Sequence, residues 1–316
     1  MIFGNEKQEQ HVPATAVTHA ASPLNKLIQL RETLLNRLSK ITQAPPINQP
    51  NTPKPLAAPP VNLAGQIHTT MQQLKAKAIS TDGRRVDYAA LKEQPAYRHY
   101  RQTYLAALRY YDPAQLPTTE SARAFWINIY NALVIDAIIH YGVSKSVTEG
   151  FIGILTFFRR AAYLIGGQRV SLEDIEHGIL RGNRGNPYTP GMHFAASDPR
   201  MAWVLPVEPR IHFALNCGGR SCPPVRAYSG DHLDAQLDLA ARAYVETAVT
   251  INEHETSITL SQIFRWFMAD FGGPSGIIQF LIQHLPNGDR RKPFLTVMHD
   301  KIQLRFQPYD WRLNNK

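Results

Sequence analysis

Cys217 is the residue whose surroundings most favour covalent chemistry. It follows Asn216 at the end of a short apolar run and precedes Gly218 and Gly219. A thiolate is a strong nucleophile at neutral pH, and turns with free backbone N–H groups favour its formation. The two glycines would let a substrate approach, and their amides could donate to an oxyanion. The pattern predicts a catalytic nucleophile at Cys217, with a small buried cysteine as the structural alternative.

The residues after this turn modify the prediction. Arg220 adds positive charge that would favour the thiolate and could contact substrate. Cys222, in front of Pro223 and Pro224, could pair with Cys217 across a tight loop in an oxidising compartment. Because no export signal is visible, we expect two free thiols. If the cysteines do pair, hydrolysis through Cys217 requires reduction.

A nucleophile needs a base, and His177 is the first candidate among the 12 histidines. A helix is expected over 172–181, with Ser171 as N-cap and Asp174 at the capping-box position. On this helix Glu173, His177 and Arg181 fall on one face at i, i+4 spacing, with Asp174 one turn before the histidine. These carboxylates could fix the tautomer of His177 and favour its protonated form, with Glu176 or Glu173 orienting it. Arg181 is a candidate for substrate binding. A surface helix held by side-chain pairs is equally compatible with these residues.

His212 is the second candidate base, and two asparagines are candidate polar partners. A regular strand places residues an odd number apart on opposite faces, so His212 and Cys217 would point apart unless a bulge intervenes. Asn128 and Asn131 lie inside an apolar stretch, where an unpartnered amide costs about 1–3 kcal/mol. They could cap a loop, or either could orient a histidine or donate to an oxyanion.

Other classes of site lack their motifs. There is no GxxxxGK[ST] loop, no GxGxxG after a strand, no HExxH and no Asp-rich calcium loop, so we expect neither cofactor nor metal. The formal net charge of +9 is not concentrated into a clamp, and the basic runs lack interleaved aromatics, which makes nucleic acid an improbable partner. The N-terminus becomes charged before an apolar leader can develop, and no run approaches the roughly 20 apolar residues of a membrane span. We therefore expect a cytoplasmic chain.

The organisation along the 316 residues indicates a helix-rich α+β fold. We expect an N-terminal segment over 1–43, with an amphipathic helix over 23–42 that has a basic polar face, and a proline-rich linker over 44–66 that acts as a spacer. A single globular domain over 67–316 follows, with a central buried helix over 122–141 and a small antiparallel sheet. Its segment 210–217 is expected to be a buried strand that ends in the cysteine loop, and 301–306 an edge strand.

Several stretches together resemble the family called domain of unknown function 547. They are AFWINIYNAL at 124–133, SLEDIEHGILR at 171–181, RIHFALNCGGRSCPPVRAY at 210–228, IFRWFMADF at 263–271 and YDWRLN at 309–314, with VDYAALK at 86–92 as the opening segment. The resemblance covers roughly 75–314. It implies that Glu176, His177 and the Cys217 loop are family hallmarks, and that the fold is papain-like or transglutaminase-like.

Two classes of function follow. The first is a cysteine-dependent hydrolase or acyl transferase acting on an amide or thioester of a small peptide-like substrate, with Cys217 as nucleophile and His177 as base. The second is a non-catalytic module that binds a ligand or peptide, with the N-terminal helix used for self-association or for a protein partner.

Overall fold

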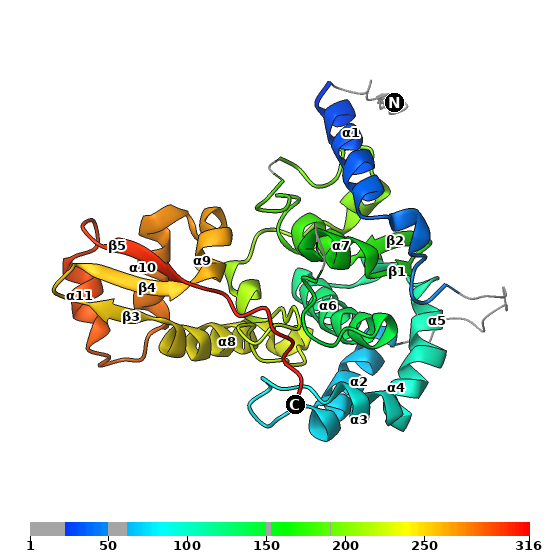
Figure 1. The fold of residues 1–316 in the computed structure, drawn as a ribbon, viewed down its shortest axis with the longest axis horizontal. Helices are drawn as coiled ribbons and strands as arrows, with labels where there is room; N and C mark the ends of the chain where they lie inside the picture. The colour runs from blue at the N-terminus through cyan, green and yellow to red at the C-terminus, as the bar shows by residue number, and fades with distance from the viewer. Residues whose placement is uncertain (1–22, 50–61, 150–152, 190) are drawn as a thin grey trace, which may run out of the picture.

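The computed structural model describes residues 23–49, 62–149, 153–189 and 191–316, and within these ranges the chain is a helix-rich α+β protein (Figure 1). The predicted fold class is confirmed. The larger lobe contains α1 (Pro23–Leu38), α2 (Leu63–Ala78), α3 (Tyr88–Glu93), α4 (Pro95–His99), α5 (Leu105–Leu108), α6 (Thr119–Tyr141), α7 (Gly153–Arg160) and the hairpin of β1 (Ala162–Ile165) and β2 (Gln168–Ser171). The smaller lobe contains β3 (Thr250–Asn252), β4 (Ser257–Ser261), α9 (Gln262–Trp266), α10 (Gly273–His284), α11 (Arg291–Val297) and β5 (Gln303–Gln307), while α8 (Leu233–Ala248) connects the two.

Helix α6 is the axis of the larger lobe. The side chain of its N-cap, Thr118, accepts a hydrogen bond from the backbone of Ser121, and the helix ends at Gly142 in the left-handed conformation. Every residue from Arg123 to Ile138 is buried. The helix is long and apolar enough to cross a membrane, but 94% of the apolar window lies inside the protein. This burial marks α6 as the central core helix that the sequence predicts.

Two asparagines of α6 hold the loop that follows residue 213. The amide of Asn128 donates to the carbonyl of Tyr228 at 2.7 Å and accepts from its N–H at 2.9 Å. Asn131 donates to the carbonyl of Ala214 at 3.0 Å and accepts from the N–H of Asn216 at 2.9 Å. The structural alternative, in which these amides cap a loop against the helix, therefore describes their contacts.

The described residues form two hydrophobic cores that meet at short segments. Along α8, Leu233 and Leu237 belong to the first core, whereas Tyr244 and Val245 belong to the second. The 3₁₀ helix η6 (Pro209–Phe213) divides in the same way, since Ile211 packs in the first core and Phe213 in the second. α8 and η6 therefore contribute side chains to both lobes.

The predicted strand over 210–217 is wrong. Pro209 begins a 3₁₀ turn, and the side chain of Glu208 accepts the N–H of Arg210, which initiates the turn. The apolar residues of this run pack in two different cores and not on one face of a sheet. The run therefore has the hydrophobic pattern of a buried strand but not the backbone geometry of one.

The sheets are small. Strands β1 and β2 pair antiparallel, as do β3 and β4, but β4 and β5 pair parallel, with Ser257 opposite Gln303. The expected antiparallel sheet therefore has one parallel pair, and β5 lies at its edge as predicted. After β5 the chain returns to the larger lobe, where Leu313 forms a bridge with Gly219.

The N-terminal segment lies on the larger lobe. The predicted amphipathic helix is α1, and Ile28 is buried on its inner face. The linker begins as a docked segment: Ile47 is buried in the first core, and the Asn48 side chain bonds to the carbonyls of Leu105 and Leu164 at 2.9 Å each. Residues 44–49 are therefore not a free spacer, and residues 50–61 lie outside the described part.

Replacing Asn131 by alanine should destabilise the protein without touching the cavity described below. The substitution leaves a buried carbonyl and a buried N–H without partners, and each costs about 1–3 kcal/mol, so we expect the free energy of unfolding to fall by roughly 2–5 kcal/mol. Urea denaturation measures the loss, with Asn287→Ala at an exposed position as the control. A loss below about 1 kcal/mol would show that the hydrogen bonds of Asn131 do not stabilise the loop.

Candidate functional site

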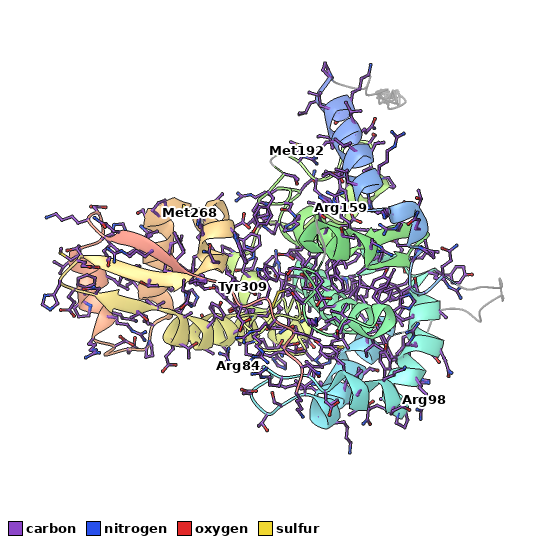
Figure 2. The ribbon with its side chains drawn as sticks, viewed as in Figure 1. Arg84, Arg98, Arg159, Met192, Met268 and Tyr309 are labelled. Carbon is purple, nitrogen blue, oxygen red and sulfur yellow. A yellow bond between two sulfur atoms is a disulfide. The ribbon has the colours of Figure 1, made fainter. Side chains whose placement is uncertain are left out.

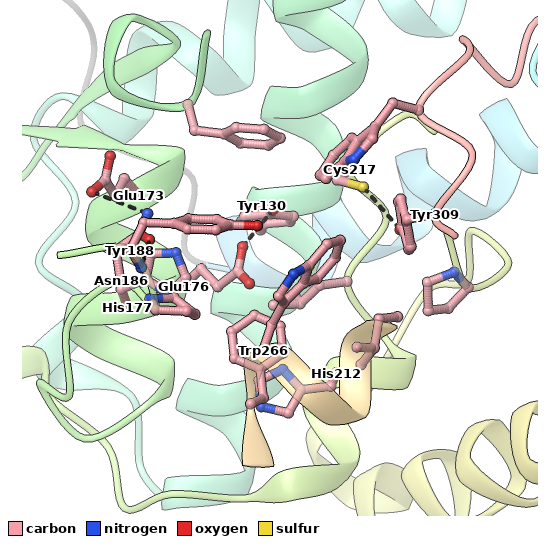
Figure 3. Close-up of a pocket in the computed structure, with 17 residues that line it drawn as sticks. Tyr130, Glu173, Glu176, His177, Asn186, Tyr188, His212, Cys217, Trp266 and Tyr309 are labelled. Carbon is pink, nitrogen blue, oxygen red and sulfur yellow. Dashed lines mark hydrogen bonds between the residues drawn. The ribbon is translucent and has the colours of Figure 1, made fainter. Parts of the chain in front are cut away.

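A narrow cavity of about 80 Å³ lies where the two cores meet (Figure 3). Tyr309, on its wall, lies between the two lobes in Figure 2. Aromatic rings are the largest group among the lining side chains, which also include carboxyls, imidazoles and one sulfur: Tyr130, Phe158, Glu173, Glu176, His177, Asn186, Pro187, Tyr188, His212, Leu215, Cys217, Pro223, Ile263, Trp266, Phe267, Tyr309 and Trp311. This is the candidate functional site.

The cavity brings together five of the side chains predicted from the sequence. They come from segments far apart in the chain and are Glu173, Glu176, His177, His212 and Cys217. Arg181 lies behind His177 and bonds to it. The remaining predicted residues are not among the lining residues: Asn128, Asn131, Gly218, Gly219 and Arg220.

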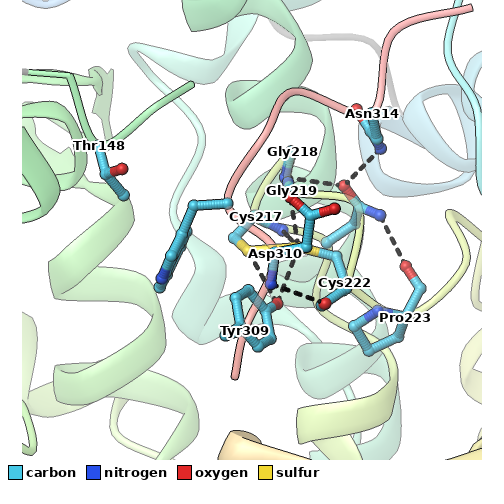
Figure 4. Close-up of a disulfide and its surroundings, with 12 residues drawn as sticks. Thr148, Cys217, Gly218, Gly219, Cys222, Pro223, Tyr309, Asp310 and Asn314 are labelled. Carbon is cyan, nitrogen blue, oxygen red and sulfur yellow. Dashed lines mark hydrogen bonds between the residues drawn. A yellow bond between two sulfur atoms is a disulfide. The ribbon is translucent and has the colours of Figure 1, made fainter. Parts of the chain in front are cut away.

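The two cysteines form a disulfide, so the expectation of two free thiols is wrong for this state of the protein (Figure 4). The two sulfurs have different surroundings. Cys222 is 2% exposed, and its sulfur accepts the N–H groups of Cys217 and Gly219 and the hydroxyl of Tyr309, each at 3.2 Å. Cys217 is partly exposed, and its sulfur lies 3.4 Å from the Tyr309 hydroxyl. In the described residues no imidazole hydrogen-bonds to either sulfur.

The predicted oxyanion donors are occupied in this state. The N–H of Gly218 donates to the Asn216 side chain at 2.9 Å, and that of Gly219 donates to Cys222. Gly218 has a φ of +85°, and a Cβ there would lie 2.8 Å from Ile138, so this position requires glycine. Arg220 is exposed, away from the cavity. The loop's glycines therefore shape the turn and do not present free donors.

The surroundings of His177 define its tautomer. Arg181 donates from Nη1 to Nδ1 of His177 at 2.9 Å, and arginine can only donate. Burial and the adjacent Arg181 charge hold the pKa of His177 well below its usual value, so the ring is neutral. A neutral ring with Nδ1 as acceptor carries its hydrogen on Nε2. His177 is thus a hydrogen-bond donor, and the base role predicted for it is not available in this state.

Glu176 has the environment of an acid–base residue. Its Oε2 accepts the hydroxyl of Tyr130 at 2.7 Å, and burial raises its pKa above the usual value. Among the described residues Glu176 forms no salt bridge. Figure 3 shows its carboxyl group directed into the cavity. A buried carboxyl with a raised pKa is suited to act as a general acid or base.

The helix that carries Glu176 and His177 differs from the expected one. Ser171 and Asp174 form the predicted capping box, with the Asp174 N–H donating to Ser171 at 3.1 Å. From there the chain is a π-helix, η4 (Asp174–Leu180), in which hydrogen bonds span five residues instead of four. Neither Asp174 nor Glu173 orients His177. Asp174 pairs with His193 at 2.8 Å, and Glu173 pairs with Arg159 at 2.7 Å.

His212 belongs to a buried network centred on Asp270. Its Nε2 lies 2.9 Å from Asp270, whose other partners include Nε of Arg181 at 2.5 Å. The hydrogen bonds from His212 and Arg181 override burial and lower the pKa of Asp270, whereas burial lowers the pKa of His212 to about 4. Nδ1 of His212 is buried without a partner in the described residues. His212 is therefore neutral, with its bare nitrogen at Nδ1.

Sequence reasoning missed Asp270 and the aromatic lining. Trp266, Tyr309 and Trp311 form a cluster with ring centroids 4.7–5.6 Å apart, and Phe267 stacks on His212 at 3.9 Å. All these residues lie in the stretches 263–271 and 309–314 that carry the family resemblance. The high density of aromatic residues in these two stretches was the signal from which this lining could have been predicted. The described residues contain no group of three or more His, Cys, Asp or Glu side chains arranged to hold a metal ion.

The fold and the cavity define a helix-rich α+β protein with a cysteine, two carboxyls and two neutral imidazoles at one site. Residues 113–245 match the family model described as "Protein of unknown function, DUF547", so the resemblance stated from the sequence is confirmed over this segment. The segment contains Glu176, His177, His212 and Cys217. No curated protein and no solved structure matches the chain, and the papain-like expectation gains no support from them.

The neutral state of His212 predicts a pH-dependent stability. The pKa of His212 is about 4 in the folded protein and about 6.5 in an unfolded chain, so the unfolded state binds more protons between these values. Stability is therefore complete above pH 6.5 and falls as the pH drops toward 4, by about 3 kcal/mol from this residue. Urea denaturation at pH 7, 5 and 4 measures the effect.

His212→Gln should flatten this pH dependence, whatever its effect on stability at pH 7. The exposed His254→Gln is the control and should retain the original slope. Equal slopes in the wild type and His212→Gln would contradict the assignment.

Proposed function

We propose that the chain is a cysteine-dependent hydrolase or acyl transferase that acts on an amide or thioester of a small peptide-like substrate, and that reduction of its disulfide activates it. The observation that carries the proposal is that Cys217, Glu176 and His177 line one cavity. Nothing in the spacing of these residues along the chain requires them to meet. A shared cavity for a sulfur, a carboxyl and a donor imidazole is the arrangement that acyl transfer requires.

The first step releases the nucleophile. Two electrons and two protons from an external thiol pair convert the disulfide into the thiols of Cys217 and Cys222. Cys217 is the sulfur on the cavity wall, and the Tyr309 hydroxyl beside it can donate to the thiolate. Burial holds the pKa of Tyr309 well above its usual value, so this hydroxyl keeps its proton.

The acyl-transfer step then uses the two η4 residues in different roles. The Glu176 carboxylate takes the Cys217 proton, directly or through a water in the cavity, and the thiolate attacks the substrate carbonyl. Nε2–H of His177 donates to the resulting oxyanion. The carbon–nitrogen or carbon–sulfur bond breaks, the leaving group receives the proton from Glu176, and the thioester on Cys217 passes to water or to an amine.

The disulfide gives this site two states. In a reducing compartment such as the cytoplasm, Cys217 would be free. In an oxidising compartment the same cavity would remain a binding site without a nucleophile.

Alkylation tests the nucleophile. We expect iodoacetamide to leave the oxidised protein unlabelled and, after reduction, to modify Cys217 about tenfold faster than free cysteine at pH 7, because the partly exposed sulfur lies beside a donor and a carboxylate base. Glu176→Gln should reduce this rate. Cys222→Ala should be labelled without any reductant, and mass spectrometry identifies the site.

The controls separate an active from a structural cysteine. Cys217→Ala removes the fast label, while His177→Ala should leave the alkylation rate nearly unchanged, because His177 acts on the substrate oxyanion. A Cys217 rate no greater than that of free cysteine would favour the non-catalytic ligand-binding module.

A second function is favoured by the outer face of α1. Five leucines there are more than half exposed, namely Leu24, Leu27, Leu30, Leu34 and Leu38. The opposite face is attached to the domain, since Glu32 accepts from Arg159 at 2.7 Å and Ile28 is buried. The leucines repeat at the spacing of a two-helix seam. We propose that α1 associates with a second copy of this chain or with a helix of a protein partner.

A double substitution tests the self-association of α1. Leu27→Glu with Leu34→Glu places charges on the leucine face while the attached face is unchanged, so the mass in solution should fall from dimer to monomer. Light scattering after size exclusion measures the mass, and Lys26→Glu is the control on the polar side. A wild-type protein that is already monomeric at about 100 μM would eliminate self-association.

A further inference from the structure

The charge of the cavity identifies the kind of ligand that would complete it. Two carboxyl side chains, Glu173 and Glu176, line the cavity, while none of the described lining residues is lysine or arginine. Both histidines on the wall are neutral by the contacts described above. The described wall therefore offers carboxyl acceptors and no lysine or arginine, and one of these carboxyls, that of Glu173, is paired with Arg159 outside the lining.

The pairing of the two carboxyls is incomplete. Oε1 of Glu173 accepts from Arg159 at 2.7 Å and from Asn186 at 3.5 Å, but Oε2 is buried with no partner in the described residues, and the side chain is 1% exposed. A buried oxygen without a donor costs about 1–3 kcal/mol, more when charged. Glu176 has a single donor, the hydroxyl of Tyr130. A ligand with several N–H groups would give Glu176 further donors from the cavity side.

The rest of the wall suits a cation. Tyr130, Tyr188, Trp266 and Trp311 border the same narrow space, and aromatic faces attract ammonium groups through the ring quadrupole. A space of about 80 Å³ admits a side-chain-sized group. An anionic ligand, by contrast, would meet two carboxyls and no lining cation.

From the Glu176 carboxyl, the aromatic wall and the lack of a lysine or arginine among the described lining residues, we propose that the cavity binds a primary ammonium group, such as that of a lysine side chain or a small amine. This proposal deepens the proposed function and rests on it for the identity of the cavity as the substrate site. There the amine would be the leaving group or the acceptor of the acyl group.

The probe is n-butylammonium, and its matched neutral control is n-butanol, which has the same chain without the charge. The indole N–H resonances of Trp266 and Trp311, assigned by substitution, report binding in a titration at pH 7. We expect n-butylammonium to bind at least tenfold more tightly than n-butanol. Equal affinities would overturn the proposal, because they would show that the pocket binds only the apolar chain and that the carboxyls do not contribute to binding.

Two further arms test the hydrogen bonds. Trimethylbutylammonium has the charge but no N–H, so it should bind several-fold more weakly; equal affinity would overturn the assignment to the carboxyls. Glu176→Gln should weaken n-butylammonium about tenfold while the exposed Glu246→Gln should not. The wild-type comparison stands even if Glu176→Gln fails to fold.

The titration uses the oxidised protein, in which no turnover can occur. Ammonium binding without accelerated alkylation of reduced Cys217 would end the enzymatic proposal and keep this one. Accelerated alkylation without ammonium binding would do the reverse.

Discussion

The buried ion pair between Arg181 and Asp270 is the interaction on which the candidate site depends. Arg181 follows the π-helix of the larger lobe, and Asp270 lies in η8 (Met268–Phe271) beside the second core. Two hydrogen bonds of 2.5 and 3.2 Å join them, and both side chains are almost fully buried. Removing Asp270 would leave the buried charge of Arg181 without its carboxylate, which typically costs about 3–5 kcal/mol, whereas Asp270 would still pair with Arg184 if Arg181 were removed.

This pair also defines the chemistry of both imidazoles. Nη1 of Arg181, which also donates to the carbonyl of Gly185, donates to His177 and so places the hydrogen of that ring on Nε2. Asp270 accepts from Nε2 of His212, which leaves the lone pair of that ring on Nδ1. The ring of Phe267 stacks on the His212 ring, and its centroid lies 4.6 Å from the guanidinium carbon of Arg181. One ion pair thus makes His177 a donor and His212 an acceptor.

The parts of the fold that the sequence predicts are those determined locally. The apolar stretch of α6, the capping box of Ser171 and the amphipathic pattern of α1 each depend on neighbours within one or two helical turns, and all were found where the pattern indicates. The residues of the site were identified by type, and Cys217, Glu176, His177 and His212 do share a cavity.

The sequence could not show which distant residues each side chain contacts in the folded protein. The run 210–217 has the composition of a strand, but its side chains divide between two cores, and only tertiary packing reveals this. In the same way, i, i+4 spacing paired His177 with Glu173 in an ideal helix. The π-helix and Arg159 redirect that carboxylate, and Arg181 takes its place.

The unequal surroundings of the two sulfurs connect the disulfide to the cavity. In thiol–disulfide exchange the attacked sulfur must be accessible, and the departing sulfur leaves faster when its thiolate is stabilised. Cys217 is the accessible one, whereas three donors surround Cys222. An external thiolate would therefore attack Cys217, form a mixed disulfide with it and expel the thiolate of Cys222; a second external thiolate then displaces the first and releases Cys217. The N–H of Gly219, which cannot serve an oxyanion while it donates to Cys222, would stabilise the departing thiolate in the first of these two steps.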